Sequence, residues 1–224
     1  MATETATPVS EGYKQTEIGE IPESWEVGSP SDLTSRCASG RWGEGEASEG
    51  SIACRVILNG KVLKNTHIAP DLPVRHFTAS EFERFGVQVD DCILVTSGAY
   101  VCNVARIRPV DVEHPTIASN FVRLLRGSNQ LTSAFLGHAL VSWHVQRQLE
   151  SWVGGSAIPN LLSAAYSRVL LPLPPLPEQQ AIADILQSVD DFIRAEEERL
   201  TQLETLKRGL MQDLLTGKVR VKVS

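Results

Sequence analysis

A long heptad pattern near the C-terminus constrains this chain more than any other feature. Within Leu171–Gly217, seam positions recur at alternating steps of four and three residues. Eight of the ten seam positions are apolar, and the other two are Glu196 and Lys207. The apolar ones are Ile182, Leu186, Val189, Ile193, Leu200, Leu203, Leu210 and Leu214. Such a repeat predicts one long helix that forms a coiled coil.

The ends of this pattern carry helix start and stop signals. Pro177 suits the first helical position, and Gly217 suits the left-handed residue that closes a helix. About 38 residues give a rod of about 57 Å, longer than a globule of this mass is wide. The stripe therefore needs a partner helix, from a second copy or from another protein. A helix folded back on its own domain is the alternative. We expect Glu196 and Lys207 to fix register and orientation.

Charge is spread unevenly along the 224 residues, whose net charge is −6. Residues 1–25 hold five acids and one base, and residues 171–224 hold nine acids and seven bases. Residues 26–170 hold thirteen of each. A middle region without net charge does not favour strong unaided binding to nucleic acid, so any such contact needs a local basic face.

Several classes of protein are disfavoured. No apolar run approaches the roughly 20 residues that span a bilayer, and the N-terminus lacks the features of a secretory signal. The four cysteines lack C-x-x-C spacing, which favours reduced thiols over a zinc site and predicts a cytoplasmic protein. No nucleophile elbow surrounds Ser97, and no P-loop, methyltransferase motif or magnesium-binding acid cluster is present. We expect a chain that is not an enzyme and holds no cofactor or metal.

The middle of the chain predicts an α+β domain. Residues 1–12 are expected to form a disordered leader. The glycine-rich stretch Cys37–Ser51 predicts a mobile surface loop, with DNA contact through Arg41 and Trp42 as the alternative. Ile52–Leu63 predicts a hairpin that turns at Asn59-Gly60. Lys61 and Lys64 follow this turn, either to meet phosphates or to lie on a solvated edge.

Further elements are expected downstream. Ser80–Phe85 predicts a short helix capped by Ser80 with Glu83 as its partner. Cys92–Gly98 predicts a buried strand and turn, and Val101–Ile107 and Ile117–Leu125 predict two more strands. Asn129–Trp152 shows helical periodicity, with Trp143 and Trp152 expected in the core. The tail 218–224 alternates like an edge strand.

Two phrases identify a family. YKQTEIGEIPESW, from Tyr13, and LPLPPLPEQQAIADIL, from Leu171, resemble the segments that flank a target-recognition domain in type I restriction–modification specificity subunits. The resemblance covers residues 13–217. It implies a DNA target-recognition domain over 13–170 and a Pro-rich collar with a conserved assembly helix over 171–217. The usual subunit has two of each, so this chain looks like a half-size form.

The resemblance also implies partners and a site. The partners are double-stranded DNA, an adenine-methylating modification subunit that uses S-adenosylmethionine, and possibly a restriction subunit. The strand loops and the Gly-Ser loop after the helical region resemble the family's DNA-facing surface. With the candidates above, they give a DNA-binding set of Arg41, Trp42, Lys61, Lys64, Thr96, Ser97, Tyr100, Arg106, Ser156 and Asn160.

The resulting hypothesis is a sequence-reading subunit whose two copies pair through antiparallel helices to form a homodimer. Two alternatives stay open. One is a silent cassette shuffled into a full-length subunit, and the other is an anti-restriction or scaffold protein that binds modification subunits without reading DNA.

Overall fold

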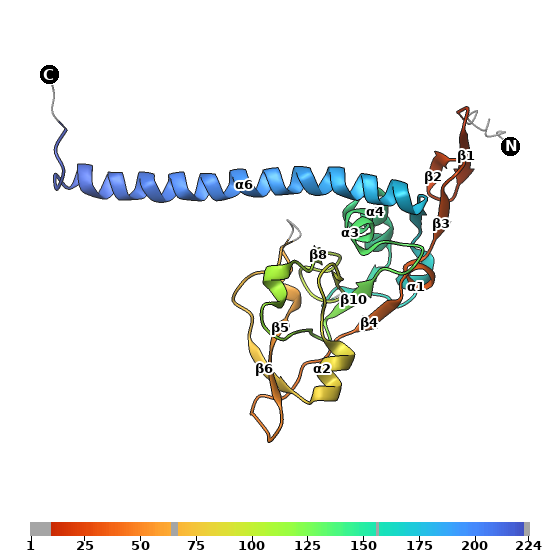
Figure 1. The fold of residues 1–224 in the computed structure, drawn as a ribbon, viewed down its shortest axis with the longest axis horizontal. Coiled ribbons are helices and arrows are strands. Elements are labelled where there is room, and N and C mark those ends of the chain that lie inside the picture. The colour runs from red at the N-terminus through yellow and green to blue at the C-terminus, as the bar shows by residue number, and fades with distance from the viewer. Residues whose placement is uncertain (1–9, 64–66, 156, 222–224) are drawn as a thin grey trace. The chain divides into compact units, whose positions relative to one another are not determined.

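The computed structural model describes residues 10–63, 67–155 and 157–221. The chain divides into two compact units, Met1–Ala181 and Ile182–Ser224. The strands are β1 (Tyr13–Thr16), β2 (Gly19–Pro22), β3 (Glu26–Gly28), β4 (Arg36–Ser39), β5 (Ile52–Ile57), β6 (Val74–Phe77), β7 (Cys92–Val95), β8 (Val104–Arg106), β9 (Thr116–Ala118), β10 (Val122–Arg126), β11 (Val153–Gly154), β12 (Asn160–Leu161) and β13 (Leu171–Leu173). The helices are α1 (Pro30–Leu33), α2 (Ala79–Phe85), α3 (Ser133–Val141), α4 (Trp143–Ser151), α5 (Ala165–Arg168) and α6 (Leu176–Leu215), with 3₁₀ turns at Asn59–Lys61 and Pro109–Val112 (Figure 1).

A four-stranded antiparallel sheet in the order β4-β10-β7-β8 forms the centre of the first unit. All four residues of β7 are buried, which confirms the predicted buried strand. Ile93, Val95, Ala105 and Leu124 contribute to one core cluster on this sheet. The mixed α/β architecture predicted from the sequence is therefore confirmed.

A second sheet has the order β6-β5-β9, and it overturns the predicted hairpin. After β5, Asn59–Lys61 forms a 3₁₀ turn, and residues 61–63 form no return strand beside β5. Instead β5 pairs antiparallel with β6 and parallel with β9. Ile117–Leu125, predicted as one strand, is two, because the chain leaves β9 through a turn and enters β10 in the other sheet.

The helices differ from the predictions in their caps and their number. Thr78, not Ser80, caps α2, and its capping-box partner is Glu81, not Glu83. The helical region 129–152 is two helices, since Ser142 is extended and ends α3. Trp143 is 63% exposed, so the prediction that it belongs to the core is wrong.

The two ends of the first unit meet. β13 pairs with β3, so Leu171 lies opposite Gly28. The Trp25 indole donates a 2.9 Å hydrogen bond to Glu178, in the first turn of α6. The buried side chain of Gln179 accepts from the Thr132 backbone N–H and donates to the Gln130 and Pro174 carbonyls. These contacts fix the start of α6 to the domain that precedes it.

The rest of α6 belongs to the second unit and confirms the predicted long helix. It runs to Leu215, and Gly217 has a φ of +74°, the left-handed conformation expected after a helix end. The described tail, 218–221, is not a strand, so the predicted edge strand is absent there. Residues 1–9 of the predicted leader, 1–12, and residues 222–224 lie outside the described residues.

Candidate functional site

Three segments that are far apart in the sequence meet at one surface, which we call the three-loop cluster: 59–61, 96–100 and 158–160. The Asn59 side-chain amide donates a 2.9 Å hydrogen bond to the Ser97 carbonyl. The Gly98 N–H donates to the Pro159 carbonyl at 2.9 Å, and Ser97 and Asn160 form an isolated antiparallel bridge. The segments therefore hold one another through backbone atoms and one asparagine side chain.

Gly98 has to be glycine for this arrangement to form. Its φ is +90°, and a Cβ atom there would lie 2.9 Å from the Asn59 amide nitrogen. A side chain would thus be strained and would press on the hydrogen bond that joins the first two loops. The predicted Ser-Gly turn after β7 supplies this residue.

Two more hydrogen bonds join the cluster and its flanking residues to neighbouring segments of the first unit. The Thr96 hydroxyl donates to the Phe121 carbonyl at 2.9 Å, and the Asn103 side chain donates to the Val62 carbonyl at 2.9 Å. Side chains whose own contacts are fixed hold a recognition surface in place before a ligand arrives. Asn59 and Asn103 were not predicted as functional residues, because a side chain that joins distant loops leaves no pattern along the sequence.

The surface of the cluster is mostly uncharged. Tyr100 and Ile158 are 44% and 60% exposed, and Phe121, whose carbonyl accepts the Thr96 hydrogen bond from outside the cluster, is 44% exposed. Lys61 forms an ion pair with Asp71. Flat, exposed aromatic side chains among backbone polar groups suit contact with a large polar partner better than enclosure of a small molecule.

Five of the ten predicted DNA-binding residues come together in this cluster. They are Lys61, Thr96, Ser97, Tyr100 and Asn160. Lys64 and Ser156 lie outside the described residues. The remaining three, Arg41, Trp42 and Arg106, lie apart from the cluster's hydrogen bonds, and all ten stay predictions as DNA contacts.

Arg41 and Trp42 form a separate group on the glycine-rich loop. Arg41 pairs with Glu81 at 2.6 Å, and the guanidinium of Arg75 lies 4.5 Å from the centre of the Trp42 ring. Two glycines of this loop allow its backbone to pack closely against neighbouring segments. A Cβ atom on Gly40 would lie 1.7 Å from the Ala118 carbonyl oxygen, and one on Gly43 would lie 2.4 Å from Phe77.

Arg106 is the last residue of β8, and its side chain lies beside α3. It lies 3.7 Å from Asp90, and its side chain is the nearest neighbour of Gly137 on α3. This position between a strand and a helix favours a packing role.

The buried cysteines are poor candidates for chemistry. Burial raises the pKa of Cys92 to about 12 and that of Cys102 to about 11. Both thiols therefore stay protonated near neutral pH, whereas a nucleophile or metal ligand needs the thiolate. Among the described residues, no group of three or more His, Cys, Asp or Glu side chains is placed to hold a metal ion. No described helix has the length and apolar content needed to cross a membrane.

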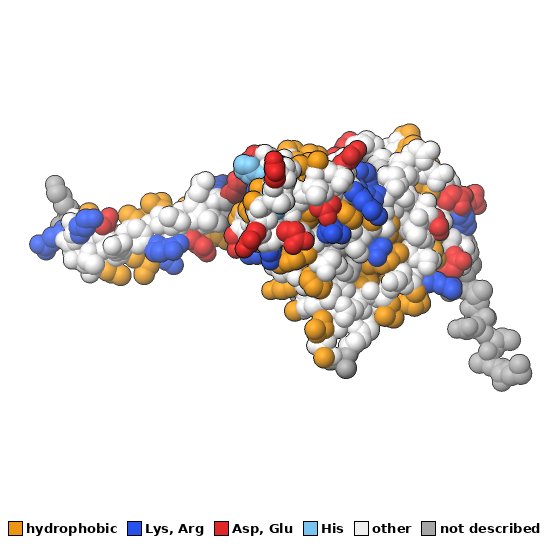
Figure 2. Space-filling view, turned by 90° about the horizontal axis from the view of Figure 1, so that it is seen from below, with side chains coloured by type: hydrophobic (Ala, Val, Ile, Leu, Met, Phe, Trp, Pro, Cys, Tyr) orange, Lys and Arg blue, Asp and Glu red, His pale blue; other side chains and the backbone are white. Residues whose placement is uncertain are grey.

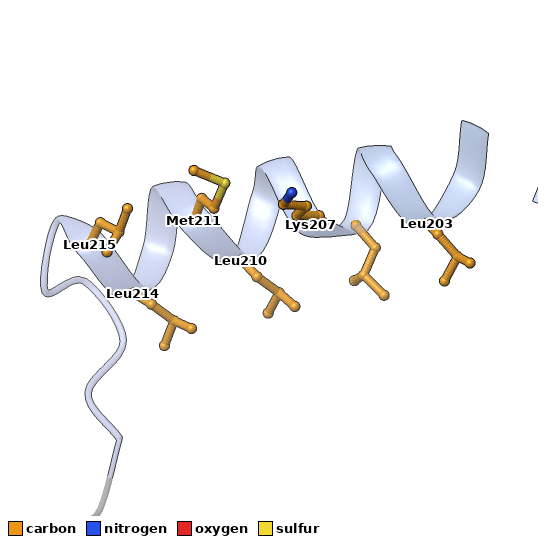
Figure 3. A pocket seen from close by; sticks show the side chains of 7 residues that line it. Leu203, Lys207, Leu210, Met211, Leu214 and Leu215 are labelled. Atoms are coloured by element: carbon orange, nitrogen blue, oxygen red, sulfur yellow. The ribbon is translucent and has the colours of Figure 1, made fainter. Parts of the chain in front are cut away.

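The second unit offers a different surface, an apolar stripe along α6. Seam residues Val189, Leu200 and Leu203 are 51%, 57% and 54% exposed. Leu203, Leu210 and Leu214 project from one side of the helix, whereas Met211 and Leu215 project from the opposite side (Figure 3). The predicted seam thus forms a continuous exposed face.

Comparison with known proteins decides the family. The family model described as the type I restriction modification DNA specificity domain matches residues 81–205, more than half of the chain. This chain belongs to that family. The matched range includes the second and third loops of the cluster and the first part of α6.

Two curated members of the family from Methanocaldococcus jannaschii are similar over most of this chain. The type I restriction enzyme MjaVIII specificity subunit is 28% identical over 215 residues, which cover 94% of this chain and 50% of that protein. The putative MjaX specificity subunit is 28% identical, covering 94% of this chain and 47% of that protein. The chain spans about half the length of these relatives.

Solved structures share the fold. The HsdS subunit from Thermoanaerobacter tengcongensis matches with a TM-score of 0.58 and 20% identity, over 86% of this chain and 48% of that chain. The S subunit of a type I restriction–modification system from M. genitalium matches with a TM-score of 0.54 and 18% identity, over 84% and 44%.

Proposed function

We propose that this chain is a type I specificity subunit that reads a DNA sequence and directs an adenine-N6 methyltransferase subunit to it. The family membership carries this proposal. The partner supplies S-adenosylmethionine and the methyl-transfer chemistry, and this chain is non-catalytic. A restriction subunit joins the same complex where the system cleaves DNA, and the complex works in the cytoplasm.

The three-loop cluster is the proposed sequence-reading surface. Its exposed groups are aromatic rings, an asparagine and backbone polar atoms, which contact base edges and sugars without a strong field of positive charge. Figure 2 supports a division of labour, because basic and acidic side chains are interspersed over the face that it shows. The modification subunits then supply much of the phosphate contact.

The α6 stripe is the proposed assembly surface. Two copies pair through antiparallel α6 helices about a two-fold axis, so that two identical recognition domains face an inverted-repeat target. An exposed apolar face along a 40-residue helix supports this proposal, because such a face is rarely left in water.

Methylation mapping tests the function. Genomic DNA is compared between cells that express the modification subunit with this chain and cells that express it alone. We expect adenine methylation at one inverted-repeat motif only when this chain is present. An asymmetric motif indicates a second, different half-subunit. Unchanged methylation contradicts the proposal and favours the silent-cassette or scaffold alternative.

A pair of tyrosine variants tests the surface. Tyr100→Ala should reduce methylation at the motif by about tenfold or more, since loss of one stacked or hydrogen-bonded base contact costs about 1–3 kcal/mol. Tyr13→Ala is the matched control, because Tyr13 is 46% exposed but lies on β1. Equal effects of the two variants would remove the three-loop cluster from the proposal.

A further inference from the structure

Two charged residues interrupt the apolar seam of α6. Glu196 and Lys207 occupy seam positions between Ile193 and Leu210. In the part of the chain that the structure describes, neither has an ion-pair partner, although the nearby Arg194 and Asp191 pair at 3.0 Å. A charge in a coiled-coil seam is costly unless the partner helix neutralises it, so these positions restrict how a second helix can dock.

Charge along the second unit is also polarised. Residues 182–198 contain six acids and one base, whereas residues 199–224 contain two acids and six bases. Figure 2 shows basic side chains gathered toward the C-terminal end of α6. A second copy in the parallel orientation would place Glu196 against Glu196 and Lys207 against Lys207. The antiparallel orientation places the acidic half of each helix beside the basic half of its partner.

One antiparallel register places each seam charge opposite a seam charge of the other sign. A two-fold axis between residues 201 and 202 places Glu196 opposite the partner's Lys207, and by symmetry Lys207 opposite the partner's Glu196. The same axis sets three apolar pairs, each formed twice. They are Val189 with the partner's Leu214, Ile193 with the partner's Leu210, and Leu200 with the partner's Leu203.

The neighbouring antiparallel register, one heptad away, does not gain apolar contacts. Its axis passes through residue 198 and pairs Ile182 with Leu214, Leu186 with Leu210 and Ile193 with Leu203. It also forms three apolar pairs twice, so the apolar contacts are balanced between the registers. However, it buries Lys207 against Val189 and Glu196 against Leu200. An uncompensated buried charge is strongly unfavourable, so the charges decide between two otherwise equal registers.

We propose that two copies of this chain dock through α6 in this register, with two reciprocal Glu196–Lys207 ion pairs on either side of a two-fold axis between residues 201 and 202. This inference rests on the pairing in the proposed function and adds the register and the residues that select it. The ion pairs make the interface specific for a helix with the same charge spacing.

Charge reversal in the full chain tests the pairing. Glu196→Lys alone and Lys207→Glu alone each replace two ion pairs by two like-charge contacts. We expect each to raise the dissociation constant of the dimer by about 100-fold or more in sedimentation equilibrium. The double variant Glu196→Lys/Lys207→Glu should dimerise like the wild type, and so should a mixture of the two single variants. Rescue in both cases separates lost pairing from a damaged helix.

Disulfide trapping reports the register directly. A mixture of Val189→Cys and Leu214→Cys chains should form a cross-linked dimer under mild oxidation, whereas Val189→Cys alone should not. In the proposed register two copies of residue 189 lie about 37 Å apart, 25 helical residues at about 1.5 Å each. Ile182→Cys with Leu214→Cys reports the displaced register, and the wild-type chain controls for its own cysteines.

The outcomes separate this inference from the function. A wild-type dimer that tolerates either single charge reversal, or that cross-links through 182 and 214, overturns the register while pairing stands. A wild-type chain that is monomeric at all concentrations overturns both the register and the homodimer. In every case, methylation mapping reports independently whether the chain specifies a DNA sequence.

Discussion

Asp91 is buried immediately before β7, and its carboxylate has several donors within the first unit. Arg126 Nε donates to one oxygen at 2.6 Å and Arg126 Nη2 to the other at 2.7 Å. The Gln88 N–H also donates to Asp91, at 2.7 Å. The hydrogen bond and charge of Asp91 raise the pKa of Arg126. This bidentate pair fixes the C-terminal end of β10 beside the loop that leads into β7.

Asp91→Asn should therefore lower the free energy of unfolding by about 3 kcal/mol, because it leaves the Arg126 guanidinium without its anion. Urea denaturation of the full chain measures the change. Asp71→Asn is the matched control, since Asp71 pairs with Lys61 but its side chain is 74% exposed. It should cost less than about 1 kcal/mol. Similar losses for the two variants would show that Asp91 is not a special structural anchor.

Two sites show which features of single residues the sequence alone does not predict. Asn59-Gly60 predicts a hairpin turn, since that dipeptide favours hairpins. The structure instead turns there in a 3₁₀ helix and uses the Asn59 amide to hold Ser97. Helical periodicity predicts Trp143 as a core residue, but Ser142 ends α3 and a new helix, α4, begins at Trp143. The local pattern fails in both cases, because a tertiary contact determines the role of Asn59 and a helix break at Ser142 precedes Trp143.

At the scale of elements, the long helix was the most predictable part, because ten seam positions in one repeat leave few alternatives. The buried strand β7 was also predictable from its apolar run. The pairing of strands was not. β5 pairs in parallel with β9 across about sixty residues, and no local pattern reports such a distant neighbour. The three-loop cluster depends on these pairings, so its candidate residues were foreseen separately but not as one surface.

Gly209 gives a prediction that belongs to α6 as a helix. It lies in the helix interior, exposed, and a Cβ atom there would meet nothing within 4 Å. Gly209→Ala should stabilise α6 by about 0.8–1 kcal/mol, because glycine loses more backbone entropy in a helix than alanine does. Thermal melting followed by circular dichroism measures this change.

Gly217→Ala should change the stability of α6 in the opposite direction. The φ of +74° at Gly217 is unfavourable for alanine, so this variant should lower the stability of the helix end by about 1 kcal/mol. A destabilising Gly209→Ala would mean that residue 209 packs against something that the isolated chain does not show.

At the scale of the whole molecule, several basic side chains of the first unit are already paired with acids. Among the described residues the ion pairs include Arg41–Glu81, Lys61–Asp71, Arg106–Asp90, Arg108–Asp111 and Arg126–Asp91. Together with a net charge of −6, these pairs reduce the positive charge that the chain offers for phosphate contact.

The chain alone should therefore bind non-target duplex DNA weakly, with a Kd of about 100 μM or weaker near physiological salt. Its salt dependence should be shallow, with a slope of log K against log salt of magnitude below about 3. Fluorescence anisotropy between 50 and 200 mM salt measures both, and addition of the modification subunit should steepen the slope. A steep slope for the chain alone would place a strong phosphate-binding face on it.

The contact between Trp25 and Glu178 has a consequence for how the protein is made. The two residues are separated by 153 positions, and they join the first strands of the domain to the first turn of α6. During synthesis β3 and Trp25 therefore lack their final neighbours until nearly the entire domain has left the ribosome. Ribosome-bound chains whose Leu171 is still inside the exit tunnel should be open to proteases at β3, and chains whose Gln179 has emerged from it should resist them.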